Sequence, residues 1–231
     1  MKTTRKIRHI SLLAGVFFLA MFSLHAEGYI PSTQWPYWYD EFQEGTVFFS
    51  GDQKSKQELL NIHLLHGTLH YLEGDRIKQS DPRGIEKIVI AADTFLYMEG
   101  ELVQLIQEKN GSCLVKQIRI DKECLTANQT GAYGMGASSS AVQQLTSIQL
   151  DGISNLSYTQ MKLEKPKGKE LKLIETYYLI RTGQPVRVTR KDLEKSLPTA
   201  DRIAFKAFVK QHKIKWKEET SLLQLLDFFD K

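Results

Sequence analysis

The sequence predicts a mainly β protein of the α+β type: a curved antiparallel meander or a partly closed barrel, with two to three C-terminal helices. Three observations predict this class. Short runs of β-branched, aromatic or alternating apolar residues recur about every 8 to 12 positions between residues 46 and 121. Tight turns join these runs, and no connection has the length of the helix that parallel strands require. After residue 190, apolar residues recur at helical spacing.

Turn residues bound each expected strand. Leu60, Ile62 and Leu64 alternate with polar neighbours, which is the period of a half-buried strand. Asn110-Gly111 predicts a tight hairpin, because both residues tolerate the positive φ angles of such a turn. The expected strands cover residues 46–50, 60–64, 68–72, 85–90, 94–98, 102–106, 114–120, 146–152 and 171–182.

Two features differ from this strand pattern. A Gly/Ser-rich stretch at about residues 127–141 is small, polar and predicted to be a loop. In the C-terminal region, Phe205, Phe208 and Val209 fall on one face of a helix. The expected helices cover residues 191–196, 200–213 and 218–229.

The N-terminus has the three parts of a cleavable signal peptide. Residues 1–8 are basic, residues 10–24 form an apolar run too short to span a bilayer, and small Ala26 precedes the expected cut. Beyond this signal no apolar stretch is long enough to span a membrane. We therefore expect an exported protein in the periplasm or cell envelope of a Gram-negative bacterium. Its parts would be a signal peptide at 1–26, an antiparallel β domain at 27–190 and a basic helical tail at 191–231.

The charge of the chain is unevenly distributed. The formal net charge is +4, but residues 1–26 hold four basic and no acidic side chains, so the remainder is neutral. A nucleic-acid partner is therefore not indicated. Residues 27–160 carry a net charge of −7 and residues 161–231 a net charge of +7. Three interpretations stay open: the basic end docks on the acidic body, it contacts an anionic surface such as envelope lipid, or its charges are only solvated.

An aromatic segment at residues 35–42 is the most distinctive local feature. Trp35, Tyr37, Trp38 and Tyr39 crowd beside acidic residues, a composition found on surfaces that stack on sugars. Aromatic side chains near a chain end also pack down over a sheet. These four residues are thus candidates for contact with a glycan or a partner, with core packing as the alternative.

Other chemical signals are weak. His63, His66 and His70 lie within eight residues, but on a continuous strand His63 and His66 point to opposite faces, so we expect exposed or hydrogen-bonded histidines and no metal site. The Gly-rich loop has no nucleotide-binding order, and the serines after it lack the elbow motif of hydrolases. We accordingly expect no cofactor and no catalytic residue.

Cys113 and Cys124 are the two cysteines of the chain. In an exported protein they have the opportunity to form one disulfide across a short loop. The residues between them read as a strand, and a straight strand would hold the two sulfurs too far apart. A bridge therefore requires the chain to turn back after Ile120, and two separate thiols are the alternative.

Three short motifs follow the order of the expected elements. They are Leu60-Asn61-Ile62 leading into Gly67 and Leu69, Gly131-Ala132-Tyr133-Gly134 before a run of serines, and Lys191-Asp192-Leu193 with the two-helix ending. In these motifs the chain resembles a group of uncharacterised exported proteins common in Bacteroidetes-type bacteria. The resemblance implies export and an antiparallel β meander with a helical tail, and it transfers no activity.

Taken together, the sequence favours a non-catalytic interaction protein of the envelope or periplasm, with an envelope protein or a glycan as partner. The motivation is the charge asymmetry and the lack of a catalytic motif. A module that binds a small ligand or glycan through Trp35 to Phe42 is the alternative function, and a hydrolase with a site assembled from scattered residues is the third.

Overall fold

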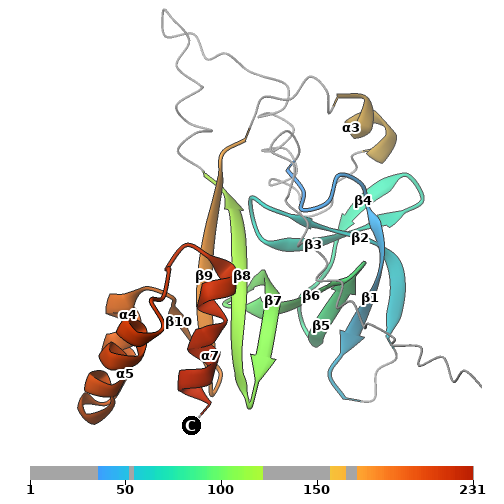
Figure 1. Cartoon of the computed structure of the whole chain (residues 1–231). Coiled ribbons are helices and arrows are strands. Elements are labelled where there is room, and N and C mark those ends of the chain that lie inside the picture. Colours follow the sequence, from blue (N-terminus) through green and yellow to red (C-terminus); the bar gives the residue numbers. More distant parts are fainter. Residues whose placement is uncertain (1–35, 52–54, 122–156, 165–170, 231) are drawn as a thin grey trace, which may run out of the picture.

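The computed structural model describes residues 36–51, 55–121, 157–164 and 171–230. In these ranges the chain forms a ten-stranded antiparallel sheet and, mostly toward the C-terminus, short helices (Figure 1). The predicted fold class is confirmed, and the sheet is open rather than closed into a barrel. The strands are β1 (Gln43–Phe49), β2 (Lys56–His63), β3 (Thr68–Glu73), β4 (Arg76–Gln79), β5 (Ile85–Ile90), β6 (Asp93–Met98), β7 (Glu101–Lys109), β8 (Ser112–Ile120), β9 (Leu173–Arg181) and β10 (Gln184–Arg187). The helices are α3 (Tyr158–Glu164), α4 (Arg190–Ser196), α5 (Thr199–Gln211), α6 (Glu219–Leu222) and α7 (Gln224–Phe229).

The sheet consists of two meanders joined at β1. Its strand order is β10-β9-β8-β7-β6-β5-β1-β2-β3-β4, so β1 pairs with β2 on one side and with β5 on the other. A single meander would have placed β4 next to β5. Instead the chain returns from the edge strand β4 to the middle of the sheet through residues 80–84.

The sheet coils so that the β2–β3 hairpin contacts β7. The backbone N–H of Leu102 donates to the carbonyl of Gly67 over 2.8 Å, although β2 and β3 are several strands away from β7 in the order. Gly67 has a φ of +62°, and a Cβ there would lie 2.8 Å from the Cβ of Glu101. A residue without a side chain is therefore needed at this crossing.

Two main hydrophobic clusters form the core, and β8 contributes to both. Ile118 and Ile120 pack with the N-terminal half of the sheet, around Trp38 and Phe95. Leu114, on the same face of the same strand, packs against the C-terminal helices. The long strand β8 thus links the body to the tail.

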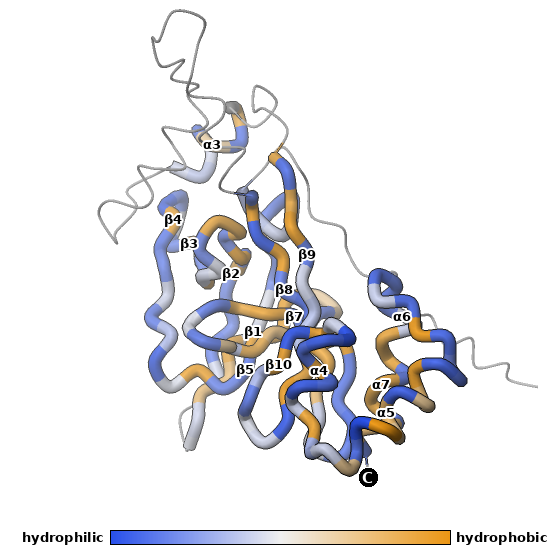
Figure 2. Tube along the Cα trace, turned by 90° about the vertical axis from the view of Figure 1, so that its left-hand side faces the viewer, coloured by the Kyte–Doolittle hydropathy of each residue, from blue (hydrophilic) through white to orange (hydrophobic). Residues whose placement is uncertain are grey.

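The helical tail packs on the β8–β9 end of the sheet. Buried residues of α4, α5, α6 and α7, among them Leu193, Phe205 and Leu225, meet Leu114 and Leu179 of the sheet. In Figure 2, hydrophilic and hydrophobic residues follow one another along α5. This is the pattern of helices with one buried and one exposed side.

Several elements differ from the expected ones. The strands β4 and β10 and the helix α3 were not predicted, and residues 218–229 form α6 and α7 rather than one helix. The expected signal peptide, the strand at 146–152 and the loop at 127–141 lie outside the described residues. Within the described ranges, no helix combines the length and the hydrophobicity needed to cross a membrane.

Candidate functional site

Two adjoining hollows between α4 and α5 form the strongest candidate site. One has a volume of about 530 Å³ and the other about 420 Å³, and they share Arg190 and Lys206. We call them together the basic groove. Its cationic lining residues are Arg190, Lys191, Lys195, Arg202, Lys206, Lys210 and Lys213. Val209, Ile214 and Trp216 add an apolar part at one end.

Local sequence signals set the orientation of the two helices. The Thr189 side chain caps α4 by accepting from the N–H of Asp192 over 3.1 Å. Pro198 separates α4 from α5. Phe205 and Val209 on α5, with Leu193 on α4, are buried against the sheet. Because these apolar positions hold one side of each helix inward, the lysines between them are turned outward.

Carboxylates are scarce in the basic groove. Glu194 lies 2.9 Å from Arg190 and 3.6 Å from Lys206, and the hydrogen bond from Arg190 lowers the pKa of this carboxyl. Within the described part of the chain, the other five groove cations form no ion pair: Lys191, Lys195, Arg202, Lys210 and Lys213. From Arg190 to Lys217 the sequence has nine basic and three acidic side chains, a net charge of +6.

The tail is attached to the body by its acidic residues. Asp227 and Asp230 pair with Lys109, and Glu219 pairs with Lys116, at 2.7, 3.0 and 2.9 Å. For residues 191–231, this polarity is the reverse of the first interpretation of the charge asymmetry, in which cations of residues 161–231 dock on carboxylates of residues 27–160. Before the tail, two described ion pairs do follow that interpretation, because Lys162 pairs with Glu41 and Lys172 with Asp121, at 2.6 and 2.9 Å. In the three ion pairs of residues 191–231 the tail contributes carboxylates, so the groove cations take no part in them.

The aromatic segment is part of the core. Tyr37, Trp38, Tyr39 and Phe42 are all buried, and the Trp38 ring meets Phe95 edge-on at 5.1 Å. Backbone hydrogen bonds to β2 hold the segment in place, from Trp38 N–H to the Ile62 carbonyl and from Leu64 N–H to the Pro36 carbonyl. Core packing is thus the observed role of Tyr37, Trp38 and Tyr39, which present no open ring face to a glycan. Trp35 lies outside the described residues.

The three clustered histidines come together, unlike the expectation from a continuous strand. The chain turns after His63, so that the rings of His66, His63 and His70 stack at centroid distances of 5.6 and 5.0 Å. His63 and His70 are buried, not exposed, and among the described residues neither ring nitrogen of His63 has a hydrogen-bond partner. The Tyr37 hydroxyl lies 2.8 Å from Nδ1 of His70. His63 and His66 do not lie on one continuous strand, because residues 64–67 form a turn.

We call His63, His66 and His70 the histidine column. Burial is the main cause of the lowered pKa of its two buried members. It lowers the pKa of His63 well below the usual range, and His70 and His66 lower it further. Burial likewise lowers the pKa of His70 to about 3, with a contribution from His66. Because the rings are nearly parallel, the lone pairs of their nitrogens lie in parallel planes and do not converge on one metal position. In the ranges that the structure describes, no three His, Cys, Asp or Glu side chains are placed to hold a metal ion.

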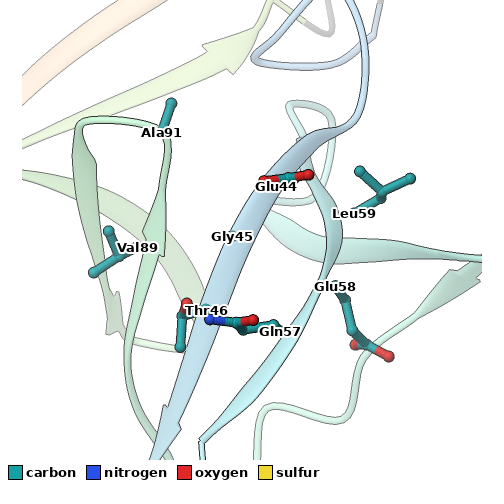
Figure 3. Close-up of a pocket in the computed structure, with 8 residues that line it drawn as sticks. All are labelled: Glu44, Gly45, Thr46, Gln57, Glu58, Leu59, Val89 and Ala91. Carbon is teal, nitrogen blue, oxygen red and sulfur yellow. The ribbon is translucent and has the colours of Figure 1, made fainter.

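A third hollow lies over the centre of the sheet (Figure 3). Its volume is about 520 Å³, and β1, β2 and the end of β5 line it. Glu44 and Glu58 are its acidic residues, but Glu58 pairs with Lys56 over 2.5 Å. In the pairing of β1 with β2, Glu44 lies opposite Leu59 and Glu58 lies opposite Gly45. The side chains of Glu44 and Glu58 therefore leave the sheet on opposite faces and do not face each other as paired catalytic acids would.

Cys113 stands at the start of β8, is half-buried, and forms no disulfide with any residue that the structure describes. Burial and the nearby Glu108 raise its pKa, so it is not an activated nucleophile. Cys124 lies outside the described residues, and its predicted disulfide with Cys113 stays a prediction.

Comparison of the chain with protein-family models, with curated proteins and with solved structures found no match. The sequence had indicated a basic tail, but not the groove between α4 and α5. The signal that identifies it is the alternation of lysines with the buried apolar positions over residues 190–213, followed by an acidic stretch that attaches the tail to the sheet.

Proposed function

We propose that the protein is a non-catalytic, exported interaction protein that binds an anionic partner through the basic groove. The observation that carries this proposal is the polarity of the tail attachment. Carboxylates of the tail bind lysines of the body, and so the groove cations are left for another molecule. Charge of one sign gathered in a concave surface attracts a partner of the opposite sign.

Electrostatic repulsion within the groove also favours binding of a partner. Like charges on neighbouring helices repel one another, and this repulsion makes the unbound groove slightly unfavourable. A polyanion relieves this repulsion when it binds. Such binding weakens as salt screens the charges, because the Debye length is only about 8 Å at physiological ionic strength.

Equilibrium binding of fluorescently labelled poly-L-glutamate to the full chain tests the proposal. The groove variant carries Lys195→Glu, Lys206→Glu and Lys210→Glu. The control variant carries Arg76→Glu, Arg83→Glu and Lys87→Glu, three equally drastic changes on β4, β5 and the link between them, far from the tail in the strand order. Both variants have the same net charge.

We expect the groove variant to bind at least about tenfold more weakly than the control, because three attractive contacts become repulsive. Thermal unfolding of both variants establishes that each is folded. Equal weakening in the two variants would mean that only net charge matters, and it would refute the groove as the binding surface.

A further inference from the structure

Resting on the proposed function, we propose that the anionic partner is the surface of a lipid bilayer with anionic headgroups, and that Ile203 of α5 enters it. Ile203 is 78% exposed, more than any other large apolar side chain of the described residues. An exposed apolar residue gains free energy when it leaves water. Because Ile203 lies beside the groove cations, its exposed side chain can enter the same surface that the cations contact.

Ile203, Lys206 and Lys210 form one row along α5. They are spaced at i, i+3 and i+7, and residues with this spacing lie on the same side of a helix. The acidic residue nearest in sequence, Asp201, is two positions away from Ile203 and so lies on the opposite side. The apolar side chain and the cations are therefore presented to the same surface.

Small residues surround Ile203. Ala200, Ala204 and Ala207 are exposed neighbours on the outer side of α5. Without bulky side chains, this side of the helix can approach a flat surface closely enough for lysines and Ile203 to reach it together. A helix with an apolar strip flanked by lysines is typical of segments that lie in the interface of a membrane.

The kind of cation favours a diffuse anionic surface over a folded acidic protein. Five of the seven groove cations are lysines, whose charge sits on a flexible stem and does not require bidentate geometry. Each Lys or Arg close to an anionic leaflet strengthens binding about fivefold. Trp216, which is half-buried, provides further apolar surface at the end of the groove.

Co-sedimentation with vesicles tests this inference. The full chain is mixed with vesicles of phosphatidylglycerol or of phosphatidylcholine, in wild-type form and with Ile203→Ser. Leu163→Ser is the matched control, because Leu163 on α3 is similarly exposed at 72% and lies outside the tail. All forms keep the same N-terminus, so the apolar run at residues 10–24 contributes equally to each.

We expect binding to phosphatidylglycerol that falls about tenfold with Ile203→Ser and stays unchanged with Leu163→Ser. Binding of labelled poly-L-glutamate should not change with either substitution, since neither removes a charge. Ile203→Trp should strengthen vesicle binding, and the emission of the new indole should shift to the blue on phosphatidylglycerol vesicles only.

The outcomes separate the two proposals. Binding to poly-L-glutamate without any preference for phosphatidylglycerol would overturn the bilayer and leave the anion-binding groove standing. Vesicle binding that is equal for wild type and Ile203→Ser would also overturn the proposed insertion. Loss of binding to both probes would refute the groove and the bilayer together.

Discussion

Lys116 Nζ of β8 lies 2.9 Å from Oε2 of Glu219 in the first turn of α6, at the border between the two hydrophobic clusters. The same carboxylate oxygen accepts from the Tyr177 hydroxyl over 3.1 Å, and burial together with Glu219 raises the pKa of Tyr177. Lys116 is only 9% exposed, so this ion pair is largely shielded from water on the lysine side. The pair fixes the tail with its acidic side toward the sheet.

Substitution of the two partners should have unequal effects. Glu219→Ala leaves a buried ammonium group without a partner and should lower the free energy of unfolding by about 2–4 kcal/mol. Lys116→Met replaces the cation by an apolar side chain of similar length, and the carboxylate left behind is partly solvated. We expect a cost below about 1.5 kcal/mol. Urea unfolding of both variants measures the difference, and equal costs would mean that the pair is not desolvated.

The histidine column should make the protein sensitive to acid. The folded state lowers the pKa of His63 and His70, so the unfolded chain binds more protons once the pH falls below about 6.5. Stability is therefore full above this pH and is lost progressively between pH 6.5 and the folded pKa, which is about 3 for His70. Each histidine contributes a slope of about 1.4 kcal/mol per pH unit.

His63→Leu tests the contribution of the central histidine. The substitution removes two buried nitrogens that lack partners, so stability at pH 7 should be maintained or increased. Between pH 6 and pH 4, the free energy of unfolding should change less steeply with pH. The slope should decrease by roughly 1.4 kcal/mol per pH unit, which is the contribution of one bound proton. Chemical unfolding over this pH range provides the measurement. A slope identical to that of the wild type would contradict the burial of a neutral His63.

Alanine substitutions at Gly67 and Gly74 form a matched comparison that tests whether the β2–β3 hairpin packs against β7. Both have positive φ angles, +62° and +61°, and so both should lose about 1–2 kcal/mol of stability on substitution by Ala. Only Gly67 lies against another strand, where a Cβ would come within 2.8 Å of Glu101, while nothing lies within 4 Å at Gly74. Gly67→Ala should be the more destabilising change by at least about 1 kcal/mol. Similar melting temperatures for the two variants would mean that the hairpin does not touch β7.

Asn61 holds the aromatic segment on the sheet. Its side-chain oxygen accepts from the N–H of Tyr39 at 3.0 Å, and its amide donates to the Tyr39 carbonyl at 2.9 Å. Asn61→Leu should cost about 2–4 kcal/mol, because two buried backbone groups lose their partners. Gln43→Ala, which removes only an exposed hydrogen bond to Glu41, should change stability by less than about 0.5 kcal/mol. Comparable costs would disprove the structural role of Asn61.

Local patterns in the sequence were sufficient for most elements but not for their arrangement. Asn110 and Gly111 do adopt positive φ, of 45° and 78°, because the requirement of the turn is local. The position of β1 between β2 and β5 depends on pairing between distant segments, for which alternation along one strand carries no information. The convergence of His63 with His70 likewise follows from the turn at 64–67.

The basic groove was missed for a similar reason. The net positive charge of the groove is visible in the sequence. Which of its charges point outward, however, depends on which residues pair with the carboxylates of the tail. Lys109 and Lys116 belong to β7 and β8, more than a hundred residues before Asp227 and Glu219. Only the folded chain brings these pairs together and leaves the lysines of α4 and α5 exposed.

Covalent labelling of lysines, with and without poly-L-glutamate, tests the central claim most directly. In the free protein, Lys195 and Lys210 should react readily with an amine-specific reagent while Lys116 stays protected. With the polyanion bound, Lys195, Lys206 and Lys210 should become protected and Lys87 on β5 should react as before. Protection of Lys87 to the same degree, or ready labelling of Lys116 in the free protein, would contradict an outward-facing basic groove.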